Sequence, residues 1–315
     1  MAQLKPGKGS RKLYKYRAFN NLTLDTLIDD RIFFADPSTF NDPLDTRPSL
    51  ETDIDGDALE AILIQLVEQR VASEMEAAAR TIRYKGPKTI SHITASSKRR
   101  ATEKAAEVRY LATDPEYDVE DPEKFLFGQY VEEELLRRYG KGIVSLAERS
   151  ICPLMWSHYG DQHRGICIGY SVPDGAESNL YKVSYGGSRL IAASDVEAML
   201  AGDVQASRRV DNAVITKKAG DWRYEREWRL VGPRGLQDSP LELEDVTFGM
   251  RCTRAAQYAV VKALEDRSRT VKFYEINERR GRFQLSKHLL NLDELCVSLP
   301  QRALDLQEAF DEEPK

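Results

Sequence analysis

The chain has 315 residues, of which 41% are hydrophobic and 31% charged, and its formal net charge is −5. This length allows one large domain or two modest ones, and the apolar content is sufficient to bury a core. The negative charge argues against unspecific coating of nucleic acid, although a local basic groove remains compatible with it.

The cysteines and the N-terminal segment narrow the class of protein further. The four cysteines are scattered and form no Cys-x-x-Cys pair, so neither disulfides nor a structural zinc site is expected. No apolar run approaches the roughly 20 residues that span a bilayer. Residues 1–12 are basic and lack the apolar stretch of a signal peptide, so we expect a flexible leader on a cytoplasmic protein.

The chain opens with a strand, a helix and a second strand. Residues 12–19 alternate in the manner of a strand, residues 22–29 carry helical spacing, and residues 31–35 form another short strand. The turn-rich stretch 36–45 ends this unit.

The composition then becomes helical. Residues 57–83 and 96–111 are rich in Ala, Glu, Lys, Arg and Leu, which predicts a largely helical insertion over 53–139 with an acidic loop at 113–123. Within it, the basic run 98–100 is compatible with a nucleic-acid contact, but a solvated helix face is the favoured interpretation.

The remainder is rich in strand patterns. We expect strands at 143–146, 165–170, 181–185, 227–231 and 271–276. Helices are predicted at 193–204 and 253–266, and the polar residues 301–315 are expected to fray. The sequence therefore predicts a single α+β domain over 13–300, with one sheet-based core and one helical insertion.

The first group of candidate site residues lies on the opening strand. Tyr14 and Tyr16 share one face of a strand, whereas Lys15 and Arg17 share the other. Such a pair of cations suits a phosphate-bearing ligand. A charged edge strand in water is the alternative, and on this motif alone it is favoured.

The second group is the turn sequence Phe-Asn-Asp-Pro-Leu-Asp at residues 40–45. Asn41 and Asp42 are good turn formers because their short side chains accept hydrogen bonds from nearby backbone amides. The alternative function makes Asp42 and Asp45 ligands of a metal ion or a ribose.

The third group lies at residues 155–170, which combine histidines and aromatic residues with a buried strand. His158, Asp161 and His163 are suitable metal ligands, but neither helix nor strand brings positions five apart together. We favour hydrogen bonding within a buried loop or contact with an organic ligand. Trp156 and Tyr159 can stack on an aromatic ligand or belong to the core.

The fourth group is the run Tyr-Glu-Arg-Glu-Trp-Arg at residues 224–229. On a strand, Glu225 and Glu227 point to the same side, while Arg226 faces the other way. Crowded carboxylates raise each other's pKa and accept hydrogen bonds from sugar hydroxyls. Cross-strand pairs on a charged edge strand are an equally weighted alternative.

Together these motifs resemble a widespread bacterial family known as domain of unknown function 2971. The resemblance is carried by Leu-Tyr-Lys-Tyr-Arg at 13–17, Phe-Asn-Asp-Pro at 40–43, Met-Trp-Ser-His-Tyr at 155–159, His-Arg-Gly-Ile-Cys-Ile-Gly at 163–169 and the run at 224–229. It extends in order from about residue 13 to residue 283 and supplies no activity.

A looser resemblance is to ADP-ribosyltransferase folds, which begin with an arginine-bearing strand and end with Glu-x-Glu. It implies a mixed, mainly antiparallel sheet and NAD as substrate, with Arg17 on the pyrophosphate and Glu227 on the ribose hydroxyl and the oxocarbenium-like charge. Glu225 would position or deprotonate the acceptor. The nicotinamide end would meet three further side chains: Trp156, Tyr159 and His158. Tyr16 and Asn41 complete the expected cofactor-binding set.

The expected function is accordingly an NAD-dependent ADP-ribosyltransferase or NAD glycohydrolase, a type of small bacterial enzyme that is common in toxin and phage-defence systems. The family's usual central Ser-Thr-Ser strand is absent here. Two alternatives remain open. One is a non-enzymatic ligand sensor or interaction module with a partner protein on the helical insertion. The other is a metal-dependent nuclease or phosphoesterase, although no metal is favoured. The acceptor, protein or nucleic acid, is left open.

Overall fold

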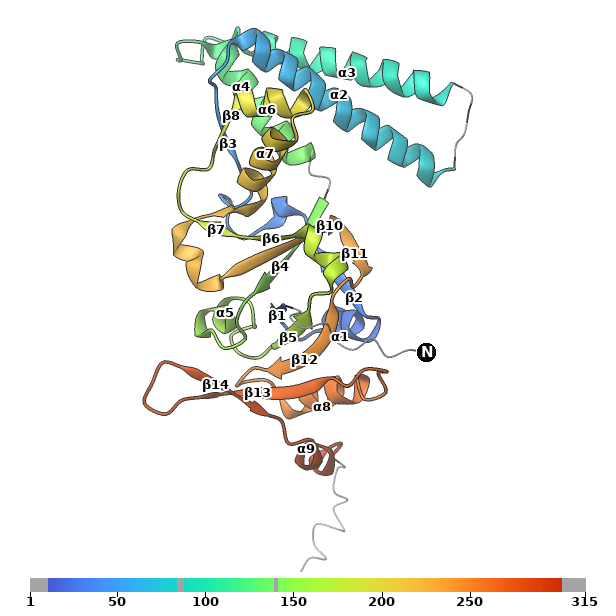
Figure 1. The fold of residues 1–315 in the computed structure, drawn as a ribbon, viewed down its shortest axis with the longest axis vertical. Helices are drawn as coiled ribbons and strands as arrows, with labels where there is room; N and C mark the ends of the chain where they lie inside the picture. The colour runs from blue at the N-terminus through green and yellow to red at the C-terminus, as the bar shows by residue number, and fades with distance from the viewer. Residues whose placement is uncertain (1–10, 84–85, 87, 139–140, 302–315) are drawn as a thin grey trace, which may run out of the picture.

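The computed structural model describes residues 11–83, 86, 88–138 and 141–301 (Figure 1). The expected leader and tail lie almost entirely outside these residues. The helical elements are α1 (Asn21–Ile28), η1 (Pro37–Thr39), α2 (Gly56–Thr81), α3 (Thr89–Leu111), α4 (Pro122–Arg138), α5 (Pro153–His158), η2 (Asp174–Asn179), α6 (Ala193–Leu200), α7 (Val204–Thr216), η3 (Gly220–Glu225), α8 (Arg254–Ala263) and α9 (Leu292–Ser298). The strands are β1 (Lys12–Arg17), β2 (Arg31–Phe34), β3 (Ser49–Glu51), β4 (Lys141–Ala147), β5 (Ile166–Ser171), β6 (Leu180–Lys182), β7 (Ser184–Tyr185), β8 (Leu190–Ala192), β9 (Lys217–Lys218), β10 (Glu227–Pro233), β11 (Gly235–Asp238), β12 (Glu242–Phe248), β13 (Lys272–Glu278) and β14 (Leu285–Leu289).

Local chemistry explains where the helices begin. Side chains of four residues accept hydrogen bonds from backbone amides in the first turns of α1, α2, α8 and α9, so each caps its helix. These residues are Asn20, Asp55, Thr253 and Asn291.

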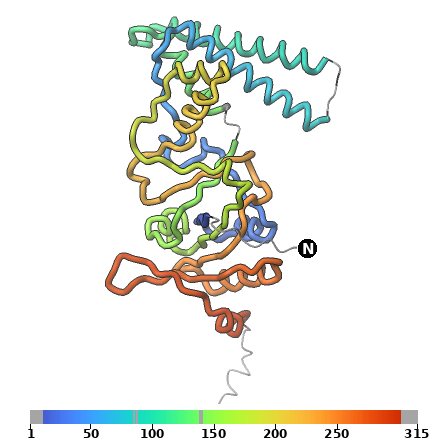
Figure 2. Tube along the Cα trace, viewed as in Figure 1, coloured from blue at the N-terminus to red at the C-terminus, as the bar shows by residue number. Residues whose placement is uncertain are grey.

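An eight-stranded sheet forms the centre, in the order β14-β13-β12-β5-β1-β4-β10-β6. Its neighbouring strands are antiparallel except for the parallel pair β12 and β13. The expected α+β class with a mainly antiparallel sheet is therefore confirmed. The chain enters beside the middle of the sheet, and its last described elements lie at the end opposite α2 and α3 (Figure 2).

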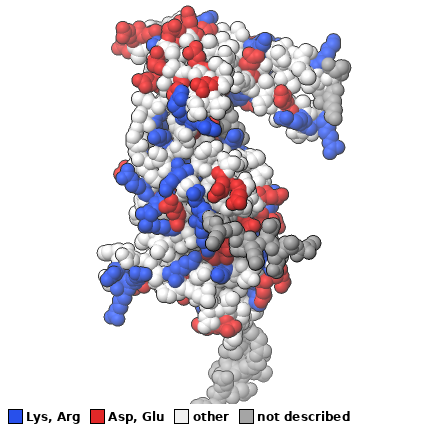
Figure 3. Space-filling model, viewed as in Figure 1, with Lys and Arg blue, Asp and Glu red and all other residues white. Residues whose placement is uncertain are grey.

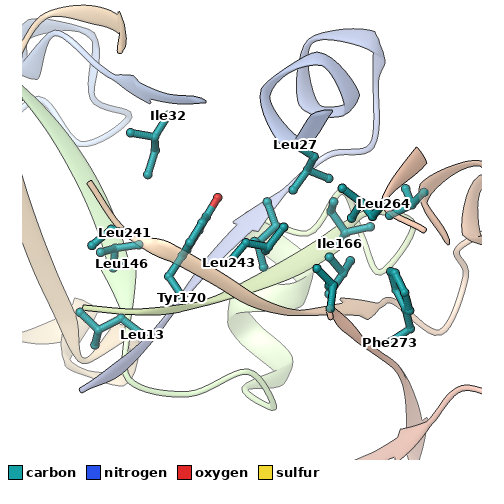
Figure 4. Close-up of a cluster of buried hydrophobic side chains, with 14 of the residues drawn as sticks. Leu13, Leu27, Ile32, Leu146, Ile166, Tyr170, Leu241, Leu243, Leu264 and Phe273 are labelled. Carbon is teal, nitrogen blue, oxygen red and sulfur yellow. The ribbon is translucent and has the colours of Figure 1, made fainter. Parts of the chain in front are cut away.

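One face of the sheet is apolar. Leu13, Ile166 and Phe248 lie on this face, and α1 and α8 cover it. Figure 4 shows Leu27 reaching from α1 towards Ile166 and Leu264 within this core. Burial of these side chains, at about 25 cal/mol per Å² of apolar surface, is the main stabilising contribution here.

The opposite face of the sheet carries polar groups. Register places Asp245, Gly169, Tyr14, Ala147 and Glu227 in one row across five strands. Directly paired residues point to the same face, so both carboxylates lie on this polar face. Each is at most 3% exposed, and a buried carboxylate is stable only with partners.

A second core unites the helical insertion with a later part of the chain. Leu63, Val67 and Phe127 of the insertion pack with Val196 and Val210 of α6 and α7. The helical layer therefore consists of two chain segments, because the insertion alone does not enclose its own apolar face. Beyond this core, the ends of α2 and α3 project as a paired arm (Figures 1 and 2).

The expected elements are largely present, but others were missed, among them β11, β14 and α9. The strand predicted at 181–185 is divided between β6 and β7. Helix α7, the short helix α5 and the central strand β12 were not expected. None of the described helices combines the length and apolarity needed to cross a bilayer.

Candidate functional site

A cavity of about 470 Å³ opens where the strands β1 and β4 separate. These strands share a single register pair, Tyr14 with Ala147. Beyond it the cavity is bounded by β1, β4, α5, η3 and the loop that follows β2. Its lining residues are Tyr14, Lys15, Tyr16, Ala35, Thr39, Phe40, Asn41, Asp45, Ser145, Leu146, Ala147, Met155, His158, Tyr159, Lys218, Glu225 and Glu227.

Lys15 occupies the opening between the two strands. Its amine donates a hydrogen bond to the Ser145 carbonyl oxygen at 3.1 Å. Among the described residues, no carboxylate lies within ion-pair distance of this amine. Burial, followed by the nearby Arg17 charge, lowers the pKa of Lys15 to about 8. The Glu227 charge opposes this shift, but it forms no ion pair with the Lys15 amine.

The other charged groups of the cavity form a compensated cluster around Lys218. Its amine lies 2.5 Å from Glu225, 3.0 Å from Glu227 and 3.4 Å from Asp45. Arg229 is fully buried and places one guanidinium nitrogen 2.7 Å from each Asp45 oxygen. Three carboxylates thus share two cations, which makes their burial possible.

Glu227 is held in its ionised form. Its Oε1 lies 3.0 Å from Nε of Arg229. Burial alone would raise the pKa of this carboxyl, but the charges of Arg229 and Lys218 outweigh burial and lower it to about 2. Glu227 consequently stays anionic across the physiological range.

Glu225 has the opposite tendency. Its pKa is raised by burial and by the Glu227 charge, although Lys218 and the Tyr159 hydroxyl act in the other direction. The Tyr159 hydroxyl donates to Glu225 Oε1 at 2.8 Å. Two neighbouring carboxylates in one cavity therefore have pKa values shifted in opposite directions, as in acid–base pairs of enzymes.

The predicted Glu-x-Glu strand is wrong in detail. Glu225 ends the 3-10 turn η3, and β10 begins only at Glu227. Arg226 between them has a φ of 48°, in the left-handed region. This backbone turn, and not strand alternation, brings both carboxylates to the same cavity.

Aromatic rings gather around His158, an exposed lining residue whose surroundings we call the cavity mouth. The ring of His158 lies 6.3 Å from that of Tyr224 and 6.4 Å from that of Trp222, measured between centroids. The Trp222 indole also donates to Asp42 Oδ2 at 2.7 Å. Because His158 is exposed at the end of α5, this group offers flat surfaces to an entering ring.

The structure brings together six of the expected site residues. They are Tyr16, Asn41, His158, Tyr159, Glu225 and Glu227, all of which line the cavity. Asp42 accepts a hydrogen bond from the Leu44 amide, as its interpretation as a turn residue requires.

Arg17 and Trp156 do not belong to this set. Register places Arg17 on the apolar face, opposite Glu227, where its charge interacts with Tyr170. It is absent from the cavity lining, so the expected contact with a pyrophosphate has no basis there. Trp156 is fully buried, and its indole donates to the Ser150 carbonyl, so it belongs to the core.

The residues of the metal-dependent alternative do not converge. His163 stacks on Trp156 in a loop where Asp161, Gln162 and His163 all have positive φ. Asp45 is paired with Arg229. Within the described ranges, no group of three or more His, Cys, Asp or Glu side chains is arranged to hold a metal ion.

Sequence reasoning missed Lys218 and Arg229. Arg229 is two residues after Glu227 on β10, so strand alternation already places both on one face. That signal was available. Lys218 carried no comparable signal, because β9 is two residues long and pairs with β7.

Residues 155–230 match a family model described as "Protein of unknown function (DUF2971)". This segment is similar to that family. It runs from α5 to β10 and thus supplies Met155, His158, Tyr159, Lys218 and both glutamates, whereas Lys15 and Asp45 lie outside it.

No curated protein matches the chain. No solved structure matches it either. The similarity to domain of unknown function 2971 therefore stands on residues 155–230, and the likeness to ADP-ribosyltransferases stays a prediction.

Proposed function

We propose that the cavity cleaves the bond between nicotinamide and ribose in NAD, as an ADP-ribosyltransferase or an NAD glycohydrolase. The observation that carries this proposal is the pair Glu225 and Glu227, which line one cavity with pKa values shifted in opposite directions. Cleavage of glycosidic bonds uses two carboxyl groups in different protonation roles around an oxocarbenium-like transition state.

Glu227 is the permanent anion of the pair. It accepts a hydrogen bond from a ribose hydroxyl and stabilises the positive charge that develops at the anomeric carbon. As the C–N bond breaks, its electron pair goes to the ring nitrogen, so nicotinamide leaves as a neutral molecule. This role needs a carboxylate that does not take up a proton, which the pKa of about 2 supports.

Glu225 is the proton-active member. Water, or a hydroxyl of an acceptor, forms the new bond to the anomeric carbon and loses its proton to Glu225. The hydrogen bond from Tyr159 and the ion pair with Lys218 fix the orientation of this carboxylate. Hydrolysis and transfer differ only in which molecule loses that proton.

The remaining lining residues fit the rest of the ligand. Lys15 lines the cavity, forms no ion pair with any carboxylate in the described part of the chain, and faces the phosphates in place of Arg17. Tyr159 and His158 lie towards the mouth and face the nicotinamide ring. The ligand therefore lies with its phosphates between β1 and β4 and its reactive ribose beside Glu227.

The test is release of nicotinamide from NAD by purified protein, with NAD binding measured by calorimetry. Glu227→Gln is expected to lower the release rate by about 100-fold or more while NAD still binds. Glu148→Gln is the matched control, because Glu148 pairs with Lys182 and Trp228 outside the cavity. NAD binding without turnover in the wild type would favour the sensor alternative, and absence of binding would refute the proposal.

The pH dependence tests the role of Glu225. A base must be ionised, so its raised pKa places the acid limb of the activity above pH 4.5, the ordinary value. Glu225→Gln is expected to remove this limb and leave a low, flat rate. An acid limb that persists in Glu225→Gln would assign the proton transfer to another group.

A further inference from the structure

The hairpin of β13 and β14 ends in a well-defined turn. The Arg279 amide donates to the Gln284 carbonyl at 2.8 Å, and the Arg282 amide donates to the Arg279 carbonyl at 2.9 Å. Gly281 has a φ of 74°, which a β-turn of this kind requires at its third position. The hairpin tip therefore has a fixed backbone and presents its side chains outward.

Those side chains combine positive charge with an exposed ring. Arg279, Arg280 and Arg282 are all exposed. Phe283 has a relative exposure of 105%, so no part of its ring is covered by the rest of the molecule. Glu278 is the acidic residue beside them. Such a ring offers a free flat face on which an unpaired base can stack.

The base of this hairpin contacts the wall of the cavity. Ile276 and Leu285 pack in one cluster with Met155 and Trp156 of α5, the helix that ends at His158. In Figure 1 the hairpin extends past the sheet on the side where α5 lies, and Figure 3 shows Lys and Arg gathered at its end. Phe283 lies in the turn, two residues before Leu285, where β14 begins.

A similar combination occurs at the mouth itself. Arg223 is exposed in η3 between Trp222 and Tyr224, whose rings lie 6.1 Å apart. Cations and flat rings therefore occur both at the hairpin tip and at the mouth. The chain as a whole has a net charge of −5, so these basic groups are a local feature.

We propose that the β13–β14 hairpin binds single-stranded nucleic acid, which continues from there across the cavity mouth. The three arginines hold phosphates through paired donors, and an unpaired base stacks on Phe283. A single strand is favoured over a duplex because only unstacked bases offer a free face to such a ring. That this strand is the acceptor of the ADP-ribosyl group rests on the proposed function; its binding does not.

The first measurement is fluorescence anisotropy of labelled oligonucleotides of about 20 nucleotides with the full chain and no NAD. The triple variant R279E/R280E/R282E is expected to bind single-stranded RNA or DNA at least about 10-fold more weakly at physiological salt. The slope of log affinity against log salt concentration should be smaller in magnitude by about 2 for this variant. Each phosphate contact on a single strand contributes about 0.7 to that slope, and three contacts are lost. Because NAD is absent, this result is independent of turnover.

Phe283→Ala separates stacking from charge. Loss of one stacked base predicts about 5- to 150-fold weaker binding of a single strand. Binding of a duplex of equal length should change by less than about twofold, because its bases are already stacked. An equal effect on both forms would contradict stacking on Phe283.

The matched control is K98E/R99E/R100E on α3, which reverses the same number of charges on the projecting arm. This variant should bind single strands within about twofold of the wild type. If this variant lost as much affinity as the hairpin variant, binding would be a general attraction between positive charge and a polyanion, and the proposal would be overturned. Absence of oligonucleotide binding would overturn it as well, and so would capture of phosphatidylserine vesicles with the same dependence on the hairpin residues. Circular dichroism checks that each variant is folded.

Discussion

Removal of the Arg229 guanidinium gives the sharpest test of how the polar face is stabilised. Arg229→Met keeps most of the side-chain volume but leaves Asp45 and Glu227 buried with Lys218 as their remaining cation. The Glu227 pKa of about 2, against 4.5 ordinarily, corresponds to about 3 kcal/mol of stability. Breaking a buried ion pair from one side costs about 3–5 kcal/mol, so we expect a loss of that size at pH 7.

Arg229→Met should also change how the free energy of unfolding depends on pH. A carboxyl with a lowered folded pKa stabilises the protein fully above its unfolded value and loses this contribution as pH falls through the folded value. Wild-type protein should therefore lose about 3 kcal/mol between pH 4.5 and pH 2 from Glu227. In Arg229→Met the carboxyl takes up a proton more readily, so the difference between variant and wild type should narrow over this window.

Urea unfolding followed by tryptophan fluorescence measures both effects, since Trp222 lies in η3 and Trp228 on β10 between Glu227 and Arg229. Arg226→Met is the control, because Arg226 is 46% exposed and lies 3.9 Å from Glu148 at the surface. It should change stability by no more than about 0.5 kcal/mol. A loss below about 1 kcal/mol for Arg229→Met, or a difference that stays constant down to pH 3, would refute this reasoning.

Gly169→Ala is expected to destabilise the protein by about 1–3 kcal/mol, because a β-carbon there would lie 2.7 Å from an Asp245 oxygen. Gly175→Ala, with nothing within 4 Å of the added carbon, is the control, and equal melting temperatures for the two variants would contradict the packing argument. Lys15→Met should weaken NAD binding by about 10-fold or more in calorimetry, since a charged hydrogen bond contributes about 1.5–3 kcal/mol. Arg17→Met, the same kind of change at a β1 residue that does not line the cavity, should leave the affinity within about twofold, and the reverse order would reinstate Arg17 as the phosphate contact.

The sequence predicted elements better than their arrangement. Residues 12–17 alternate strongly enough to predict β1, and the helical insertion was evident from its composition. Strand order and register depend on pairs far apart in the chain, such as Tyr14 with Ala147, and a single sequence carries no signal for them. For that reason Arg17 was assigned to the site although it does not line the cavity.

The candidate site was likewise predicted only where its residues are close together in the sequence. Glu225 and Glu227 were found because they are close in sequence, although a left-handed residue rather than a strand aligns them. Lys218 is the central cation of the cluster, yet the residues around it in sequence form no motif. A buried charge is compensated by residues that are close in the structure but can be distant in the sequence. The sequence alone therefore does not predict this cluster.

The helical layer constrains how this protein can be divided. Because the core of α2–α4 is completed by Val196 and Val210, and reaches Ile143 and Val231 on the sheet, deletion of residues 53–139 would uncover apolar surface on three separate parts of the chain. Expression of the insertion alone would expose the apolar surface of α2–α4 that α6, α7 and the sheet cover. The layer and this end of the sheet should therefore unfold as one cooperative unit, and a shortened protein would need new polar residues on α6 and α7 to remain soluble.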